Sequence, residues 1–211
     1  MNDQESQIKN FSQTWPKPSK NNPIIIIGTG GIVKDAHLPA YKKAGFNVHG
    51  LYDVDKQKAE ELAKEYEIEN VYDSLEKAFE NENCIFDLAL PPATLLEVVD
   101  KLPQNIYAIF QKPLGRSLEE GNKIRKICHQ KNIKACMNFQ LRFSPIMLPV
   151  YEAIKNDLLG DLVELEVHVN VHTPWELWPF LKTLDRVEVP LHSIHYIDSV
   201  SYTHLRAHET S

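Results

Sequence analysis

The sequence of 211 residues predicts an α/β fold, in which a doubly wound parallel sheet is followed by an incomplete α/β domain with an open sheet. Short apolar runs alternate with helical patterns from residue 23 to residue 138, as strands and crossover helices do in such a sheet. The first run, Ile24–Ile27, is β-branched throughout and leads straight into a glycine turn at residues 28–31. A strand, a glycine turn and a helix in this order open a Rossmann-like βαβ unit that binds a dinucleotide.

The elements after the glycine turn follow one another at short intervals. A helical pattern over residues 32–44 contains Pro39, so we expect that helix to kink or restart there. Further strands are expected where apolar residues run together, at residues 48–53, 71–72, 85–90, 106–110 and 133–138. Helices are expected between the strands, where apolar residues recur with helical spacing, at residues 55–66, 75–80, 94–102 and 117–131.

After residue 138 the pattern changes. Residues 145–159 look helical, and Gly160 is suited to end that helix. Residues 162–172 then alternate apolar and polar side chains, which predicts one strand of a half-buried sheet. A single strand cannot form a stable sheet, yet no further strand pattern follows.

The chain end shows a second anomaly, because residues 199–211 resemble a translated sequencing adaptor. We therefore expect the natural gene to continue past Asp198, and the alternative is a genuine short C-terminus. The predicted segments are a flexible polar arm at residues 1–22, a dinucleotide-binding domain at 23–143, a truncated substrate and oligomerisation domain at 144–198, and a non-native tail at 199–211.

The composition excludes several classes of protein. A formal net charge of −6 gives no basic surface for nucleic acid or an anionic membrane, and no apolar run reaches the length of a membrane span. Residues 1–22 are polar and lack the apolar segment of a signal peptide. Three cysteines without metal-ligand spacing indicate reduced thiols, so a cytoplasmic enzyme is expected.

The glycine turn and a following acid predict the cofactor site. Gly28, Thr29, Gly30, Gly31 and Ile32 would hold the pyrophosphate. Val33 stands where a third glycine is usual, which implies a slightly wider approach of helix to strand.

Asp53 lies 20 residues after Val33, at the end of an expected strand, where a carboxylate accepts hydrogen bonds from the adenosine ribose. The same charge would repel a 2′-phosphate, so NAD is favoured and NADP remains possible. The alternative is an ordinary strand–helix turn, which the spacing to Asp53 disfavours.

Two further strand ends carry candidate site residues. Pro91 and Pro92 follow one strand, and Gln111 and Lys112 follow another, at the edge of the sheet where parallel α/β proteins bind ligands. Pro113 restrains the backbone beside Lys112, so its ammonium could be aimed at a ligand. A solvated surface lysine is the alternative.

His192, His195 and Asp198 would lie in a rough stripe along a helix. Their spacing converges poorly on a metal ion, so no metal site is predicted. A role for one of these histidines as a general base near neutral pH is a better interpretation than a metal ligand. The other histidines read as surface or core residues.

The same residues resemble the glucose–fructose oxidoreductase / inositol dehydrogenase family, written Gfo/Idh/MocA. The similarity spans residues 24–198 and rests on the order and spacing of several motifs. They are the glycine turn followed by His-Leu-Pro-Ala at 37–40, Gln-Lys-Pro at 111–113, Arg-Phe-Ser-Pro at 142–145 and His-Tyr-Ile-Asp at 195–198.

The resemblance implies a Rossmann domain joined to an open-sheet domain that is often buried in a homo-oligomer. It also implies NAD(P)-dependent oxidation or reduction of a sugar, polyol or related small molecule. Lys112 matches the family's lysine, which orients the substrate, and His195 matches the histidine that takes the hydroxyl proton. Arg142, Trp175, His192 and Asp198 are further substrate candidates, although Trp175 could equally pack its own loop.

Two departures from the family pattern keep another class of function open. Gln111 replaces the more usual Glu, and Leu191 stands where many members place Asp. His192 or Glu188 could take over from that missing acid. The alternative is a non-catalytic NAD-binding regulatory or scaffold protein.

Overall fold

The computed structural model describes residues 8–170, 172, 176, 181–182, 184 and 186–205. The chain divides into two compact units. One is Pro18–Asn138, and the other combines Met1–Lys17 with Phe139–Ser211. None of the described helices is long and apolar enough to cross a membrane.

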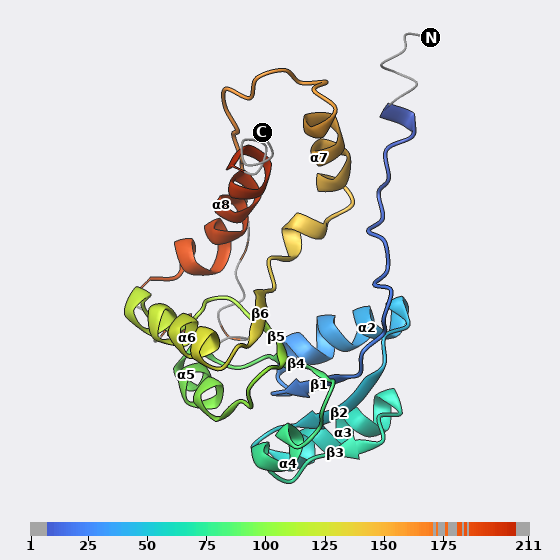
Figure 1. The fold of residues 1–211 in the computed structure, drawn as a ribbon, viewed down its shortest axis with the longest axis vertical. Coiled ribbons are helices and arrows are strands. Elements are labelled where there is room, and N and C mark those ends of the chain that lie inside the picture. Colours follow the sequence, from blue (N-terminus) through green and yellow to red (C-terminus); the bar gives the residue numbers. More distant parts are fainter. Residues whose placement is uncertain are drawn as a thin grey trace. The chain divides into compact units, whose positions relative to one another are not determined.

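The first unit contains one parallel sheet of six strands among the described residues, shown in Figure 1. Its strands are β1 (Ile24–Ile27), β2 (Val48–Tyr52), β3 (Asn70–Val71), β4 (Ile85–Leu88), β5 (Tyr107–Phe110) and β6 (Lys134–Met137). They lie in the order β3-β2-β1-β4-β5-β6, and every neighbouring pair is parallel. The order reverses between β1 and β4, as in a doubly wound Rossmann sheet, so the predicted fold class is confirmed.

Helices cover both faces of this sheet. Its helices are α2 (Leu38–Ala44), α3 (Lys56–Tyr66), α4 (Leu75–Phe79), α5 (Pro92–Lys101) and α6 (Leu118–Gln130), with the π-helical turn η1 (Val33–His37) before α2. Alternate isoleucines of β1 point to opposite faces. Ile24 and Ile26 pack with η1, α2 and α3, whereas Ile25 and Ile27 pack with α4, α5 and α6. A strand buried on both sides needs an apolar run, which the four isoleucines supply.

The helix expected to kink or restart near Pro39 runs on without a break. The π-helical turn η1 passes directly into α2, with right-handed helical φ and ψ at His37 and Leu38, and Pro39 is the second residue of α2. Gly45, in the left-handed region with φ 74°, ends α2. Ser74 caps α4 and Ser117 caps α6, each accepting a hydrogen bond from a backbone N–H three residues later.

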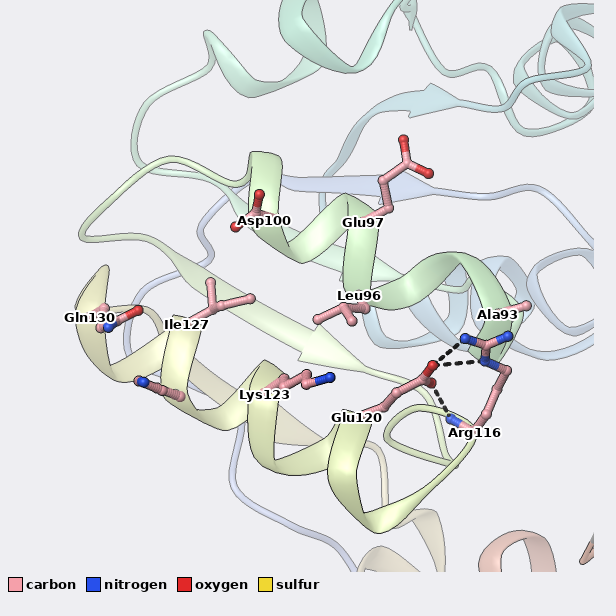
Figure 2. A pocket seen from close by; sticks show the side chains of 10 residues that line it. Ala93, Leu96, Glu97, Asp100, Arg116, Glu120, Lys123, Ile127 and Gln130 are labelled. Carbon is pink, nitrogen blue, oxygen red and sulfur yellow. Dashed lines mark hydrogen bonds and ion pairs between the residues drawn. The ribbon is translucent and has the colours of Figure 1, made fainter.

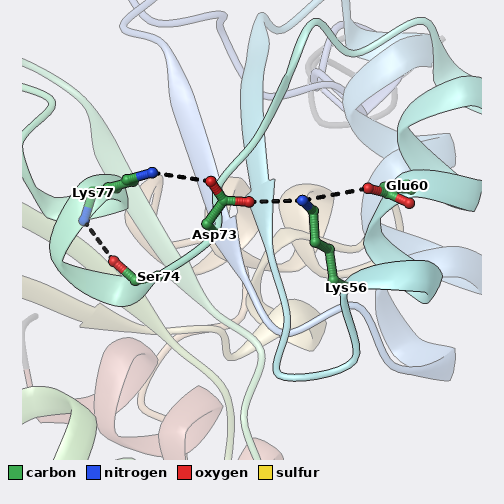
Figure 3. A network of polar contacts seen from close by, with 5 residues as sticks. All are labelled: Lys56, Glu60, Asp73, Ser74 and Lys77. Atoms are coloured by element: carbon green, nitrogen blue, oxygen red, sulfur yellow. Dashed lines mark hydrogen bonds and ion pairs between the residues drawn. The ribbon is translucent and has the colours of Figure 1, made fainter.

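Asp73, in the loop before α4, joins two helices through an exposed ionic network, shown in Figure 3. Its carboxylate accepts from Lys56 Nζ at 2.7 Å and from Lys77 Nζ at 2.9 Å. Lys56 opens α3 and also lies 3.6 Å from Glu60. The network therefore links the beginning of α3 to α4.

The second unit is helical in its described part. It contains η2 (Gln140–Phe143), α7 (Met147–Lys155), η4 (Val189–Ser193), α8 (Ile194–Val200) and η5 (Ser201–Leu205). Helix α8 packs against η2, and η5 continues α8 without a break. Trp15 from the N-terminal segment meets Phe143 edge to face, with ring centroids 5.1 Å apart.

The strand expected over residues 162–172 is not formed. Residues 162–170 and 172 have no regular secondary structure, and the side chain of Val163 is 95% exposed. The alternation was a real strand pattern, but a strand forms only when a neighbour accepts its backbone hydrogen bonds. No strand of the described second unit offers that pairing. The prediction of a strand there is wrong for the described residues.

Candidate functional site

The glycine turn lies between the carboxyl ends of β2 and β4. The N–H of Gly28 donates to the carbonyl of Tyr52 at 2.7 Å. Gly28 has φ +96°, and a Cβ there would stand 2.5 Å from the carbonyl oxygen of Ala89. Only glycine fits both the backbone conformation and the space. Gly28 therefore serves the turn itself.

Gly30 and Gly31 have a different surrounding. A Cβ on Gly30 would meet nothing within 4 Å, and a Cβ on Gly31 would meet only Asp35 Oδ2, at 3.8 Å. The following helix closes its first turn with the N–H of Val33, which donates to the Gly30 carbonyl at 2.9 Å. The N–H groups of Gly31 and Ile32 precede that ladder and have no partner within the helix. Open space beside N–H groups at a helix start suits an anion such as a pyrophosphate.

Asp53 follows β2 directly, and its carboxylate is held on both oxygens. Oδ2 accepts from the backbone N–H of Thr29 at 2.6 Å and from the Thr29 hydroxyl at 2.8 Å. Oδ1 accepts from the N–H of Asp55 at 2.9 Å. The structure therefore joins two predicted site residues, Thr29 and Asp53, directly.

The other predicted cofactor residues lie at the ends of β4 and β5. Pro91 precedes α5 and Pro92 is its first residue, so both stand at the carboxyl edge of the sheet. Gln111 and Lys112 follow β5, and the Lys112–Pro113 peptide bond is cis. Lys112 is half-buried, and desolvation lowers the pKa of its ammonium. A surface lysine in full contact with water would not show this shift.

Sequence reasoning missed a buried polar network behind this edge, centred on Asp87 of β4. Asp87 is fully buried, and its Oδ2 lies 2.6 Å from His37 Nδ1 and accepts from the Tyr41 hydroxyl at 2.9 Å. Gln111 Nε2 makes a long contact of 3.5 Å to Oδ1, and Asn138 donates to Gln111 Oε1 at 3.2 Å. Burial and the neighbouring carboxylate raise the pKa of the Tyr41 phenol.

A signal for this network was present in the sequence. Asp87 interrupts an otherwise apolar strand, Ile85–Leu88, and carboxylates are almost never fully buried without partners. The partners themselves come from η1, α2 and the ends of β5 and β6. Their meeting depends on the register of the sheet, which spacing along the chain does not reveal.

In the second unit, His195 and the residues near it come together around α8. His195 is buried, and its ring meets Phe139 edge to face with centroids 5.9 Å apart. Arg142 of η2 forms an ion pair with Asp198 of α8, with Nε donating to Oδ2 at 3.0 Å. The Arg142 guanidinium also lies 4.5 Å from the ring centre of Tyr202. Two substrate candidates, Arg142 and Asp198, thus satisfy each other and hold α8 to η2.

The remaining predicted residues of this unit lie around Leu191. Leu191 itself is buried. His192 Nδ1 lies 2.9 Å from Glu188 Oε2, and this contact lowers the pKa of the Glu188 carboxyl. Trp175 lies outside the described residues. Among the residues that the structure describes, no three His, Cys, Asp or Glu side chains come together as a metal site would require.

A groove of about 560 Å³ lies between α5 and α6 (Figure 2). Its floor contains Leu96 and Ile127, and its rim is charged. Several rim charges are paired locally, as in the ion pairs of Arg116 with Glu120 and of Lys123 with Glu119. The groove contains none of the residues that the sequence predicts for the site.

Comparisons with known proteins agree with this geometry. The sequence pattern of the GFO_IDH_MocA family, an oxidoreductase family with an NAD-binding Rossmann fold, matches residues 23–139. Glucose-6-phosphate 3-dehydrogenase of Bacillus subtilis is 27% identical over 151 residues, which are 68% of this chain and 41% of that enzyme. The chain spans less than half the length of the first curated relatives that it matches.

Solved structures with a similar fold include a protein named as a dehydrogenase and a protein named as a super-repressor mutant. The WlbA dehydrogenase of Bordetella pertussis, in complex with NADH and UDP-GlcNAcA, is 17% identical with a TM-score of 0.69, over 88% of this chain and 59% of that chain. A super-repressor mutant of Gal80p from Saccharomyces cerevisiae is 20% identical with a TM-score of 0.59, over 67% of this chain and 40% of that chain. At these identities the likeness supports the fold alone.

Proposed function

The chain belongs to the Gfo/Idh/MocA oxidoreductase family, and on that premise we propose that it transfers hydride between NAD and a hydroxyl or keto group of a sugar, polyol or related small molecule. The observation that carries the proposal is the pairing of an open glycine turn with Asp53 where the strand order reverses. When bound, the nicotinamide supplies the hydride acceptor or donor. The chain's own residues supply binding, orientation and proton transfer.

The cofactor residues divide by the group they would hold. Gly30, Gly31 and Ile32 offer space and backbone N–H groups for the pyrophosphate. Asp53 offers a carboxylate for the adenosine ribose. Pro91 and Pro92 line the β4 end of the same edge.

Lys112 and His195 carry the proposed chemistry. Lys112 orients the substrate oxygen, and its lowered pKa leaves the ammonium able to exchange a proton more readily than an exposed lysine would. His195 takes the proton from the substrate hydroxyl while hydride leaves the carbon that bears this hydroxyl. The loss of one proton and one hydride accounts for the oxidation of the alcohol to a carbonyl. His195 is a buried histidine, as a general base shielded from bulk water would be.

We propose distinct roles for the other candidates. Glu188 and His192 form a carboxylate–imidazole pair. This pair can replace the aspartate that many family members have at the position of Leu191. Arg142 and Asp198 neutralise each other, so we propose that they position α8. Trp175 stays a candidate for stacking on a sugar ring. A homo-oligomer stays an expectation that rests on the family resemblance alone.

The test follows NADH absorbance while the protein, expressed from a full-length clone, is offered NAD⁺ with a panel of sugars and polyols. We expect turnover by the wild type, and loss of at least about a hundredfold in Lys112→Ala and in His195→Ala, because general acid–base groups contribute on that scale. NADH fluorescence should show that both variants still bind cofactor. Lys123→Ala removes an exposed lysine of α6 and is the matched control. Unchanged turnover in Lys112→Ala would refute the assignment.

A regulatory function is the second candidate. Gln111 and Leu191 favour it, since both replace an acid of the family pattern with a neutral residue. Gal80p shows that the fold also occurs in a repressor. A full-length wild type that binds NADH tightly and oxidises no compound of the panel with NAD⁺ would support this second candidate over the first.

A further inference from the structure

Thr29 and Asp53 form a clamp whose consequence for cofactor choice goes beyond the family pattern. Thr29 is buried and donates twice to one oxygen of Asp53, through its N–H at 2.6 Å and its hydroxyl at 2.8 Å. The neighbouring Gly28 N–H is bonded to Tyr52, so the turn that carries Thr29 is itself fixed to β2. The position of the carboxylate therefore depends on the glycine turn as well as on β2.

A count of acceptor sites shows what the clamp leaves for a ligand. An ionised carboxylate offers about four lone-pair sites, two on each oxygen. The N–H and the hydroxyl of Thr29 occupy both lone-pair sites of Oδ2. The N–H of Asp55 occupies one lone-pair site of Oδ1, at 2.9 Å. One site on Oδ1 remains. It can accept one ribose hydroxyl, and it cannot accept a phosphate, which carries no proton to donate in its dianionic form.

We propose that Thr29 is a specificity-determining residue, which holds Asp53 in place so that the carboxylate excludes a 2′-phosphate and selects NAD(H). The inference rests on the cofactor-binding part of the proposed function and is independent of the substrate. A carboxylate that is free to rotate can turn away from an incoming phosphate, because its side-chain torsions are soft. The Thr29 hydroxyl opposes that rotation, since turning Oδ2 away would break its hydrogen bond.

The contribution of the hydroxyl can be separated from that of the backbone. Thr29→Val keeps the shape and the N–H bond and removes only the hydroxyl. Thr29→Ser keeps the hydroxyl. Asp53→Asn removes the charge on which discrimination depends. These changes, alone and combined, form a double-mutant cycle for the ratio of the two dissociation constants.

The experiment titrates the whole chain with NADH and with NADPH, following nucleotide fluorescence. We expect the wild type to prefer NADH. Thr29→Val should lower the preference about tenfold, the scale of one hydrogen bond to a charged group. Thr29→Ser should stay within about twofold of the wild type, because it keeps that bond. In the Asp53→Asn background, Thr29→Val should change the ratio by less than about twofold.

Several results would overturn the inference. One is a folded Thr29→Val with unchanged preference, and another is an equal effect of Thr29→Val with and without Asp53→Asn. If Thr29→Val fails to fold, Thr29→Ala against Thr29→Ser decides the same point. A wild type that binds both nucleotides equally overturns this inference and leaves NAD binding intact. A wild type that binds neither overturns the proposed cofactor site as well.

Discussion

Gln111 replaces an acid of the family pattern, and its surroundings supply a physical reason. Its Nε2 lies 3.5 Å from Oδ1 of the fully buried Asp87, and its Oε1 accepts from Asn138. A carboxylate in the same place would face the Asp87 carboxylate with no donor between them. The neutral amide therefore fits beside the buried Asp87, which weakens the support that Gln111 gives to the regulatory candidate.

This account predicts a pH-dependent loss of stability in Gln111→Glu. The neighbouring Asp87 should raise the pKa of the new Glu in the folded state. Between its ordinary pKa of about 4.3 and the raised value, the folded state binds more protons than the unfolded state, so stability falls as pH rises. We expect a loss of about 1–3 kcal/mol relative to wild type near pH 8, and a smaller loss near pH 5, in urea unfolding.

Gln111→Met is the matched control, because it removes both hydrogen bonds without adding a charge. Its loss of stability should be the same near pH 5 and near pH 8. An equal loss at both pH values in Gln111→Glu would contradict the role assigned to Asp87.

At the scale of elements, Asp73 shows how an exposed network can tie two helices together. Its partner Lys56 opens α3 and its partner Lys77 lies in α4 (Figure 3). The hydrogen bonds from Lys56 and then Lys77 lower the pKa of the Asp73 carboxyl to about 2. Exposed pairs stabilise weakly and are screened by salt, so the effect should be small.

The lowered pKa sets the sign of the expected pH dependence in Asp73→Asn. The stabilisation by Asp73 is present above its ordinary pKa of about 3.8 and is lost as pH falls through about 2. Asp73→Asn should therefore lower the thermal midpoint by no more than a few degrees near neutral pH. It should match the wild type near pH 2 and also at high salt. Glu65→Gln, which removes an exposed acid of α3 outside the network, is the control. A deficit that persists at high salt would argue against an ionic cause.

Elements differ in how far the sequence alone could predict them. The strands β1, β4 and β5 could be predicted because each is mainly apolar and lies inside the sheet. The irregularity beside Pro39, where the π-helical turn η1 gives way to α2, could be anticipated from the missing N–H of proline. The strand expected over residues 162–172 could not be excluded, because its alternation is a local property and its pairing is not. The spacing of apolar residues predicts which face of a strand would be buried. Whether the strand forms depends on a neighbouring strand that pairs with its backbone.

At the scale of the whole molecule, the meeting of the glycine turn with Asp53 was predictable because topology fixes it. A glycine turn after β1 and an acid after β2 must meet, because β1 and β2 are parallel neighbours. The network around Asp87 draws instead on η1, α2, β4, β5 and β6, and only the folded register brings those residues together. The roles of Lys112 and His195 stay predictions, since they rest on the family pattern.

The central claim is that residues 28–32 and Asp53 bind NAD, and a titration of the 211-residue chain with NADH tests it most directly. The matched variant is Gly30→Val, because a Cβ there meets nothing within 4 Å and the side chain begins in the space proposed for the pyrophosphate. We predict that the wild type binds NADH, and that Gly30→Val unfolds at the wild-type midpoint while its affinity falls about tenfold or more, since the backbone must approach the pyrophosphate closely. No binding by the wild type, or undiminished affinity in Gly30→Val, would contradict the account.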